Sequence, residues 1–184
     1  LYMRGLVASG YRAEVSLAQF LVTLDGPNSN GPFLDLGCGT APLSVAAAKK
    51  FKRVIGVDIA FRWLVVAKKR LQQAGVDVPL ICACAEALPF PKEQFSVVAS
   101  ESVLEHLKDQ QQAMREIERI LVPGGRCFAS TPNRYSLGPD PQIGILAGGY
   151  LPEAAIATIV RRQGGIPPIR RLLSAGTLRK LAID

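Results

Sequence analysis

The amino-acid sequence predicts an α/β fold organised around a doubly wound, mostly parallel sheet. Short apolar runs that read as buried strands alternate with longer stretches of helical periodicity. The run at 32–36 contains an acid and breaks into the turn Gly37-Cys38-Gly39, and the run at 53–58 ends in an acid. A strand that turns through glycines into a helix and returns as a second strand is the βαβ unit of such sheets.

Local pattern predicts each element in the first third of the chain. The stretch 11–24 has helical periodicity, and its expected buried face carries Val15, Ala18, Leu21 and Val22. After the strand at 32–36, Thr40 is expected to cap a helix over 42–51, because proline suits the first helical turn. A second apolar strand is predicted over 53–58.

The same alternation continues beyond residue 60. An amphipathic helix over 61–74 is expected to stop at Gly75, and the prolines within 85–94 predict a loop there. The other expected elements are strands at 79–82, 95–99 and about 126–130 and a helix at 109–121 whose apolar face carries Ala113, Met114, Ile117, Ile120 and Leu121. Because nothing after residue 135 reads as a strand, we expect five parallel strands with one exposed edge.

Length and composition predict one domain. The chain has 184 residues and 48% hydrophobic content, which suffices for a substantial core. We divide it into an N-terminal helical segment at 1–30, a cofactor-binding core at 31–133 and a basic, apolar, substrate-side segment at 134–184. No run of 18 residues lacks charges and breakers, and no signal peptide is recognisable, so we expect a cytoplasmic protein. Because the first residue is Leu1 rather than Met, we expect a piece of a longer protein.

Charge and cysteine content exclude some function classes. The net charge is +7, and residues 134–184 hold seven Lys and Arg against three Asp and Glu. These cations lack interleaved aromatic residues, so a solvated basic face is favoured over a nucleic-acid groove. The chain has one histidine, and no C-x-x-C pair occurs among the four cysteines Cys38, Cys82, Cys84 and Cys127. We therefore expect no metal site and reduced thiols.

Asp58 follows Gly39 by 19 residues, where a βαβ unit returns its second strand. A carboxylate there can accept the ribose hydroxyls of a nucleoside bound over the glycine turn, and the alternative is that it caps the next helix. The dinucleotide pattern G-x-G-x-x-G would need glycine where Pro42 stands, and the Asp35 carboxylate would repel a pyrophosphate. These residues favour adenosine with a positively charged tail, a plain tight turn being the alternative for the glycines.

Several ordered motifs strengthen this interpretation. They are Leu34-Asp35-Leu36-Gly37-Cys38-Gly39-Thr40, Val54-Ile55-Gly56-Val57-Asp58, Ala85-Glu86-Ala87-Leu88-Pro89-Phe90, Ser102-Val103-Leu104-Glu105-His106-Leu107, Arg119-Ile120-Leu121-Val122-Pro123-Gly124-Gly125-Arg126 and Ser130-Thr131-Pro132-Asn133. In this order they resemble the class I S-adenosylmethionine-dependent methyltransferases, most closely the branch called type 11. The resemblance covers about residues 30–135 and implies a Rossmann-like sheet, of which the usual last two strands are lacking in this chain.

The resemblance implies S-adenosylmethionine as cofactor and in-line methyl transfer to an O, N or C atom of a small-molecule or lipid-like acceptor. The carboxyl ends of the strands would gather the site at one rim of the sheet. By resemblance, Asp35 and Gly37 would hold the methionine end of the cofactor, and Asp58 would hold the ribose. Cys84, Ala85 and Glu86 would contact the adenine edge, and Ser100 or Glu101 would lie near the sulfonium. The further cofactor-binding candidates are Cys38, Gly39 and Ile59.

Three residues depart from the family pattern, one of which, Ser96, replaces a frequent Asp at the start of the fourth strand and is interpreted as structural. Family members usually have Asp where this chain has Cys84, and a thiol is a poor acceptor for the adenine amino group. Without a substitute such as Glu86 or a water molecule, the loss would weaken binding by about 1–2 kcal/mol. Ala41 replaces a common third glycine and adds a methyl group to the turn.

Three functions are compatible with these patterns. Methyl transfer is the first, with His106 as the candidate general base or, alternatively, as a structural brace for its loop. The second is a binding or partner module that keeps the cofactor fold without turnover, as Cys84 and the short sheet suggest. The third, a nicotinamide-dependent oxidoreductase, is disfavoured by Pro42 and Asp35. The apolar stretch 142–163 ends in two arginines and suggests a cap on the acceptor pocket or a contact with an anionic membrane surface.

Overall fold

The computed structural model describes residues 13–20, 31–138, 144–164, 167 and 171–183. Its strands are β1 (Phe33–Leu36), β2 (Val54–Asp58), β3 (Leu80–Cys82), β4 (Phe95–Glu101) and β5 (Leu121–Ser130). They form one sheet in the order β3-β2-β1-β4-β5, in which every neighbouring pair is parallel. The expected five-stranded parallel sheet is therefore confirmed, with its strand order reversing between β1 and β4.

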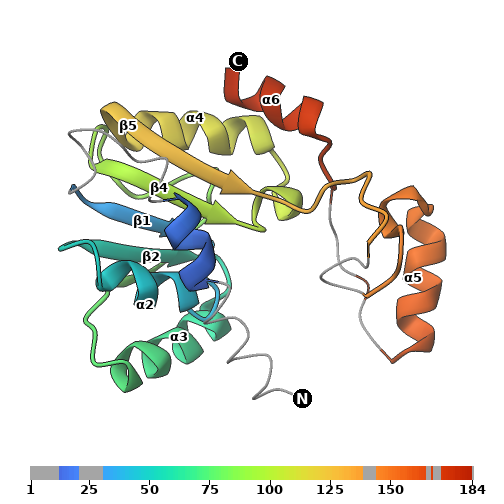
Figure 1. The fold of residues 1–184 in the computed structure, drawn as a ribbon, viewed down its shortest axis with the longest axis horizontal. Helices are drawn as coiled ribbons and strands as arrows, with labels where there is room; N and C mark the ends of the chain where they lie inside the picture. Colours follow the sequence, from blue (N-terminus) through green and yellow to red (C-terminus); the bar gives the residue numbers. More distant parts are fainter. Residues whose placement is uncertain (1–12, 21–30, 139–143, 165–166, 168–170, 184) are drawn as a thin grey trace.

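Helices cover both faces of this sheet, as Figure 1 shows. The helices of the chain are α2 (Pro42–Ala48), α3 (Phe61–Gln73), α4 (Gln110–Ile120), α5 (Glu153–Arg162) and α6 (Ala175–Ile183), besides the one at 13–20, and η1 (Leu104–His106) and η2 (Gly148–Tyr150) are short 3-10 turns. Most expected bounds hold within a few residues, although α2 ends three residues before the expected Phe51. The predicted loop over 85–94 is confirmed.

Two apolar cores sandwich the sheet. One joins α2, α3 and the helix at 13–20 to β1, and it includes Phe33, Leu43, Ala67 and Leu71. The other joins α4 and the 85–90 loop to the opposite face, and it includes Leu34, Val98, Ile117 and Ile120. The strands are apolar at successive positions because both faces of a parallel sheet are covered. The apolar face predicted for α4 is confirmed, with Ala113, Ile117 and Ile120 buried.

The N-terminal helix presents a different face from the one its spacing predicts. Residues 13–20 are helical, but Val15 is 38% exposed, and the side chains that enter the core are Ala13, Leu17 and Phe20. The Phe20 ring packs against Phe128 and Phe33, with centroids 4.9 and 6.0 Å away. Burying the Phe20 ring removes more apolar surface from water than burying Val15 would, so the helix turns its Phe20 face toward the core. Leu21 and Val22 lie outside the described residues.

Strand β5 begins at Leu121, directly after α4 and earlier than the expected residue 126. Its pairing with β4 shifts between Phe95 and Val97, and residues 122–125 form the irregularity. Gly124 lies there with a φ of 75°. The prolyl and glycyl residues therefore form a bulge within the strand rather than a loop before it.

The C-terminal segment returns to the carboxyl end of the sheet. In Figure 1, α5 stands beyond the tip of β5, whereas α6 lies beside α4. In the sequence between α5 and α6, Leu173 pairs with Asn133 in an isolated parallel bridge. The backbone N–H of Arg171 donates to the Glu105 carbonyl at 2.6 Å. The segment after α5 is thus fixed against η1.

Helix α2 begins at a strained residue. Thr40 does not cap the helix as predicted, because the residue at the cap position is Ala41, which has a left-handed φ of 60° and no side-chain hydrogen bond. The turn from Gly37 to Gly39 is bound to β2 and sets this backbone path. An L-residue in this conformation costs roughly 1–2 kcal/mol, which explains why glycine would be preferred there.

We predict that Ala41→Gly raises the free energy of unfolding by about 1 kcal/mol, because glycine removes the left-handed strain. The matched control is Ala47→Gly, a buried position inside α2, where the same change should lower stability by about 1 kcal/mol or more. Urea denaturation followed by circular dichroism measures both. Equal destabilisation by the two substitutions would contradict the assignment.

Candidate functional site

A cavity of about 510 Å³ lies over the carboxyl ends of β1 and β2. Ligands bind at this edge of open parallel sheets, where the strand order reverses. Eight of the twelve residues predicted for the site line the cavity: Gly37, Gly39, Asp58, Ile59, Cys84, Ala85, Glu86 and His106. They come from the turn after β1, the end of β2, the loop after β3 and η1, so the topology gathers them from four separate segments.

The Asp58 carboxylate holds the glycine turn in place. Its Oδ2 accepts the N–H of Gly39 at 2.8 Å, and its Oδ1 accepts the N–H of Ala60 at 2.8 Å. Asp58 is not the cap of α3 that the alternative predicted, because the cap residue is Ala60 and no side chain caps the helix there. The Asp58 side chain lines the cavity, where the ribose contact remains a prediction. Each oxygen keeps a lone pair for another donor.

Glycine is required at the first position of the turn. Gly37 has a φ of 74°, and a Cβ there would overlap the Val103 side chain. Its N–H and that of Cys38 both donate to the Val57 carbonyl, at 2.7 and 2.9 Å. At Gly39, by contrast, a Cβ would enter open space on the cavity side. The backbone there is accessible to a ligand.

Four of the predicted residues do not line the cavity: Asp35, Cys38, Ser100 and Glu101. Asp35 is 3% exposed and accepts a hydrogen bond from the Ser44 hydroxyl at 2.5 Å. Burial raises the pKa of Asp35, whereas the hydrogen bond from Ser44 lowers it. Burial is the larger effect, and the pKa is about 7. Burial also raises the pKa of Cys38. Ser100 is fully buried, and its hydroxyl has no hydrogen-bond partner among the described residues.

Cys84 and Glu86 form a hydrogen-bonded pair at the side of the cavity nearest β3. The Cys84 thiol donates to the Glu86 carboxylate at 2.6 Å, and this bond raises the pKa of Cys84. The other Glu86 oxygen accepts the backbone N–H groups of Lys108 and Asp109, at 3.1 and 3.5 Å. Burial acts to raise the pKa of Glu86, but these hydrogen bonds outweigh it and the pKa is lowered.

His106 extends from η1 into the cavity wall. Its side chain is 41% exposed, and its Nε2 lies 4.0 Å from the Glu105 carboxylate, which is fully buried. The second Glu105 oxygen accepts the Thr131 hydroxyl at 2.8 Å. This arrangement places the ring beside a buried carboxylate and leaves it accessible to a ligand.

Sequence reasoning missed several lining residues, of which the most informative are Trp63, Ser102, Val103, Leu107 and Lys108. Ser102 has a left-handed φ of 55° at the exit of β4. Within the motif Ser102 to Leu107, residue type marks His106, and more weakly Glu105, as candidates for proton transfer. The lining role of Ser102, Val103 and Leu107 depends on how the loop folds, for which a single sequence holds no signal.

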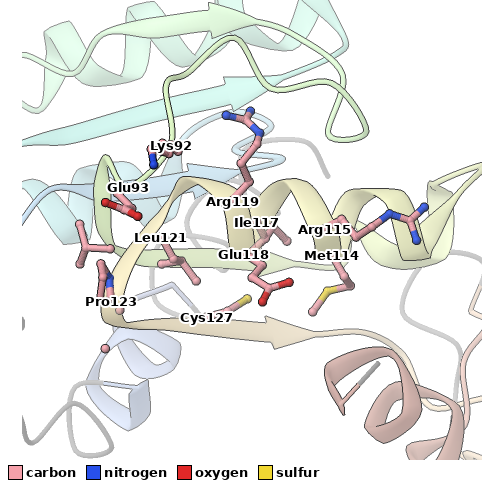
Figure 2. Close-up of a pocket in the computed structure, with 13 residues that line it drawn as sticks. Lys92, Glu93, Met114, Arg115, Ile117, Glu118, Arg119, Leu121, Pro123 and Cys127 are labelled. Atoms are coloured by element: carbon pink, nitrogen blue, oxygen red, sulfur yellow. The ribbon is translucent and has the colours of Figure 1, made fainter.

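A second, more open hollow of about 740 Å³ lies between α4 and β5, as Figure 2 shows. It contains none of the predicted site residues. Its cationic Arg119 is held by Glu116 at 2.7 Å and by the carbonyls of Phe90 and Leu88. Although this hollow is larger than the cavity over β1 and β2, it is not the candidate site, because none of the predicted site residues lines it. This hollow is a groove along the edge of the sheet.

Among the residues that the structure describes, no group of three or more His, Cys, Asp and Glu side chains is arranged to hold a metal ion. No helix within the described part of the chain has both the length and the apolar character needed to cross a bilayer.

Sheet order, glycine turn and cavity together define the class I methyltransferase fold. Comparison with known proteins agrees: the family model described as a methyltransferase domain matches residues 34–129, which is more than half of the chain. The chain belongs to this type 11 family of methyltransferase domains.

Relatives of known sequence and structure extend this result. The ubiquinone biosynthesis O-methyltransferase of Pseudomonas entomophila is 41% identical over 102 residues, which cover 55% of this chain and 44% of the relative. The enzyme of the same name from Coxiella burnetii is 34% identical over 113 residues, covering 61% and 47%. The chain thus spans about half the length of the curated relatives it matches.

Solved structures share the fold. The YcgJ protein of Bacillus subtilis has a TM-score of 0.67 at 23% identity, over 90% of this chain and 65% of that one. An S-adenosylmethionine-dependent methyltransferase of Clostridium acetobutylicum has a TM-score of 0.58 at 21% identity, over 66% and 53%. At these identities the similarity establishes the fold alone.

The raised pKa of Asp35 predicts a pH-dependent stability. Because the folded pKa of about 7 exceeds the ordinary 3.8, the folded state binds the proton more tightly than the unfolded chain. The free energy of unfolding should therefore fall as pH rises from about 4 to about 7, by at most about 1.4 kcal/mol per unit. Asp35→Asn keeps an acceptor for Ser44 and should remove this component of the slope. Urea titrations at several pH values measure it, and equal slopes for the two proteins would contradict the burial argument.

Proposed function

We propose that the chain is the cofactor-binding part of an S-adenosylmethionine-dependent methyltransferase that acts on a small-molecule or lipid-like acceptor. The observation that carries this proposal is the Asp58 carboxylate, which lines the cavity while holding the Gly39 turn at its edge. The family assignment supports the same chemistry.

The residues present fit the cofactor. Gly39 leaves open space at the turn, and Asp58 retains one lone pair on each oxygen, which suits the two adjacent hydroxyls of a ribose. Ile59 and Leu107 supply apolar surface beside the polar pair of Cys84 and Glu86. We assign the methionine end to the turn at Gly37 and Gly39. Asp35 is buried in β1 just before this turn, and Ser100 and Glu101 lie at the end of β4.

When bound, S-adenosylmethionine would supply a sulfonium-activated methyl group: the acceptor atom would bond to the methyl carbon in line as the carbon–sulfur bond breaks and S-adenosylhomocysteine leaves. The chain's own residues bind, orient and exclude water, which provides most of the acceleration for an already activated methyl group. His106 is the candidate to remove a proton from the acceptor, because its ring lines the cavity. The buried Glu105 carboxylate lies 4.0 Å from the Nε2 of this ring.

The acceptor is proposed from the relatives and from the exposed surface. Because the curated relatives are named for ubiquinone biosynthesis, we favour an oxygen acceptor on a lipid-like molecule. Apolar side chains near α5 are exposed, among them Leu146 at 69%, Tyr150 at 55% and Leu151 at 38%. With Arg161 and Arg162 at the end of α5, they suit an anionic membrane surface.

The first two residues of the predicted apolar stretch 142–163 lie outside the described part of the chain. The four cysteines are free, in keeping with the cytoplasm.

A module that binds the cofactor without turnover is the second candidate. The observation that favours it is Cys84, whose thiol donates to Glu86. This side chain presents no carboxylate to the cavity, although family members usually have Asp at this position. This alternative predicts cofactor binding without transfer to any acceptor, whereas an enzyme transfers the methyl group once a suitable acceptor is supplied.

Isothermal titration with S-adenosylhomocysteine tests the proposal. We predict micromolar binding that Asp58→Ala weakens about tenfold or more, since a hydrogen bond to a charged group is lost. The matched control is Asp77→Ala, which removes an exposed carboxylate outside the cavity and should leave the affinity unchanged. A folded wild-type sample that binds NAD but not S-adenosylhomocysteine would contradict the proposal.

Membrane contact is tested separately, by co-sedimentation with phosphatidylglycerol vesicles. We expect the protein to sediment with these anionic vesicles and not with phosphatidylcholine, and a variant carrying Leu146→Ser and Tyr150→Ser to lose the interaction. Val65→Ser is the control, because Val65 is 48% exposed on α3, away from this surface. No sedimentation by the wild-type protein would remove the membrane assignment.

A further inference from the structure

The wall of the cavity that carries Val103, His106, Leu107 and Lys108 has little regular structure of its own. Its helical turn, η1, is three residues long, and no side chain among the described residues caps it. So short a turn satisfies few of its own backbone groups. The position of this wall therefore depends on hydrogen bonds to other segments.

Arg171 supplies two of these hydrogen bonds from far along the chain. Its backbone N–H donates to the Glu105 carbonyl at 2.6 Å, and its guanidinium donates to the Lys108 carbonyl at 3.1 Å. One residue thus holds the wall both within η1 and just after it. The Gln110 side-chain amide donates to the Leu104 carbonyl at 2.8 Å and to the Arg171 carbonyl at 3.5 Å, which joins these contacts to the start of α4.

Lys108 is held between Arg171 and the cavity. Its carbonyl accepts the Arg171 guanidinium, and its backbone N–H donates to the Glu86 carboxylate at 3.1 Å on the cavity side. Arg171 itself is exposed and does not line the cavity. Any effect of Arg171 on a ligand there is therefore exerted through the backbone of the wall.

The segment that carries Arg171 is itself anchored to the chain after β5. Leu173 is 5% exposed and pairs with Asn133, and its carbonyl accepts the N–H of Arg134 at 2.9 Å. Arg171 is therefore presented to η1 from a fixed backbone. A contact made from such a backbone can order a neighbouring loop at a low cost in conformational entropy.

From these contacts we infer that Arg171 is a positioning residue for the cofactor cavity, which keeps the wall at 103–108 in the conformation that binds the ligand. This inference rests on the proposed function, because the ligand is the same cofactor. Without the guanidinium, the wall adopts its binding conformation for a smaller fraction of the time. The apparent affinity for a ligand falls by that fraction.

Isothermal titration with S-adenosylhomocysteine tests this inference. We expect Arg171→Ala to weaken binding about threefold to tenfold, which is the effect of one hydrogen bond. Arg171→Lys should restore the affinity to within about twofold of the wild type, because an ammonium group can donate to the same carbonyl. Arg179→Ala is the matched control, because it removes the same charge from an exposed position on α6 outside the cavity, and it should leave the affinity unchanged.

Hydrogen–deuterium exchange separates positioning of the wall from a general loss of stability. In the unliganded Arg171→Ala variant, peptides covering residues 103–109 should exchange about threefold to tenfold faster than in the wild type, whereas peptides covering β1 and β4 should be unchanged. Saturating S-adenosylhomocysteine should return residues 103–109 close to the exchange of the liganded wild type, because ligand binding and ordering of the wall are coupled reciprocally.

The remaining outcomes separate the inference from the proposed function. Equal affinities of the wild type and Arg171→Ala would overturn the inference and leave the proposed function intact. Faster exchange throughout the sheet would overturn it too, since Arg171 would then contribute only to overall stability, and so would an Arg171→Lys variant as weak as Arg171→Ala. A folded wild-type protein that does not bind S-adenosylhomocysteine would overturn the proposed function, and the inference with it.

Discussion

The cavity depends on one carboxylate that joins two parts of the chain. Asp58 accepts the N–H of Gly39 after β1 and the N–H of Ala60 before α3, so the turn and the helix start are fixed at the end of β2. A buried or half-buried N–H without a partner is costly, and the bridge satisfies two of them with one side chain. The same bridge sets the backbone path that leaves Ala41 left-handed. Local folding and the proposed ribose contact therefore involve the same group.

Another wall of the cavity is held by polar contacts. Glu105 accepts the Thr131 hydroxyl with its side chain and the Arg171 N–H with its carbonyl, and the Arg171 guanidinium donates to the Lys108 carbonyl at 3.1 Å. These bonds link η1 to the end of β5 and to the segment before α6. His106 and Glu86 thus occupy a wall that the C-terminal part of the chain stabilises, although the matched family model ends at residue 129.

Strands and the α4 face were predictable because burial on both sides of a parallel sheet imposes apolar runs and strict periodicity. The prediction was wrong where a distant contact decides the outcome. The packing of Phe20 on Phe128 turned the first helix away from the Val15 face, and the bridge from Asp58 displaced Thr40 as a cap. For the site, topology predicted the lining positions at Asp58 and residues 84–86, whereas Asp35, Ser100 and Glu101 on β1 and β4 do not line the cavity. The cavity wall at Val103 and Lys108 was not predicted, because its shape arises from contacts between loops.

Hydrogen–deuterium exchange with and without S-adenosylhomocysteine tests the central claim, that the ligand occupies the cavity over β1 and β2. We predict slower exchange in peptides covering the Gly37–Gly39 turn, residues 58–60, residues 84–86 and residues 102–108. Peptides covering the α4–β5 hollow, residues 114–127, should be unchanged. Protection confined to that hollow, or no protection in a folded sample at saturating ligand, would contradict the account.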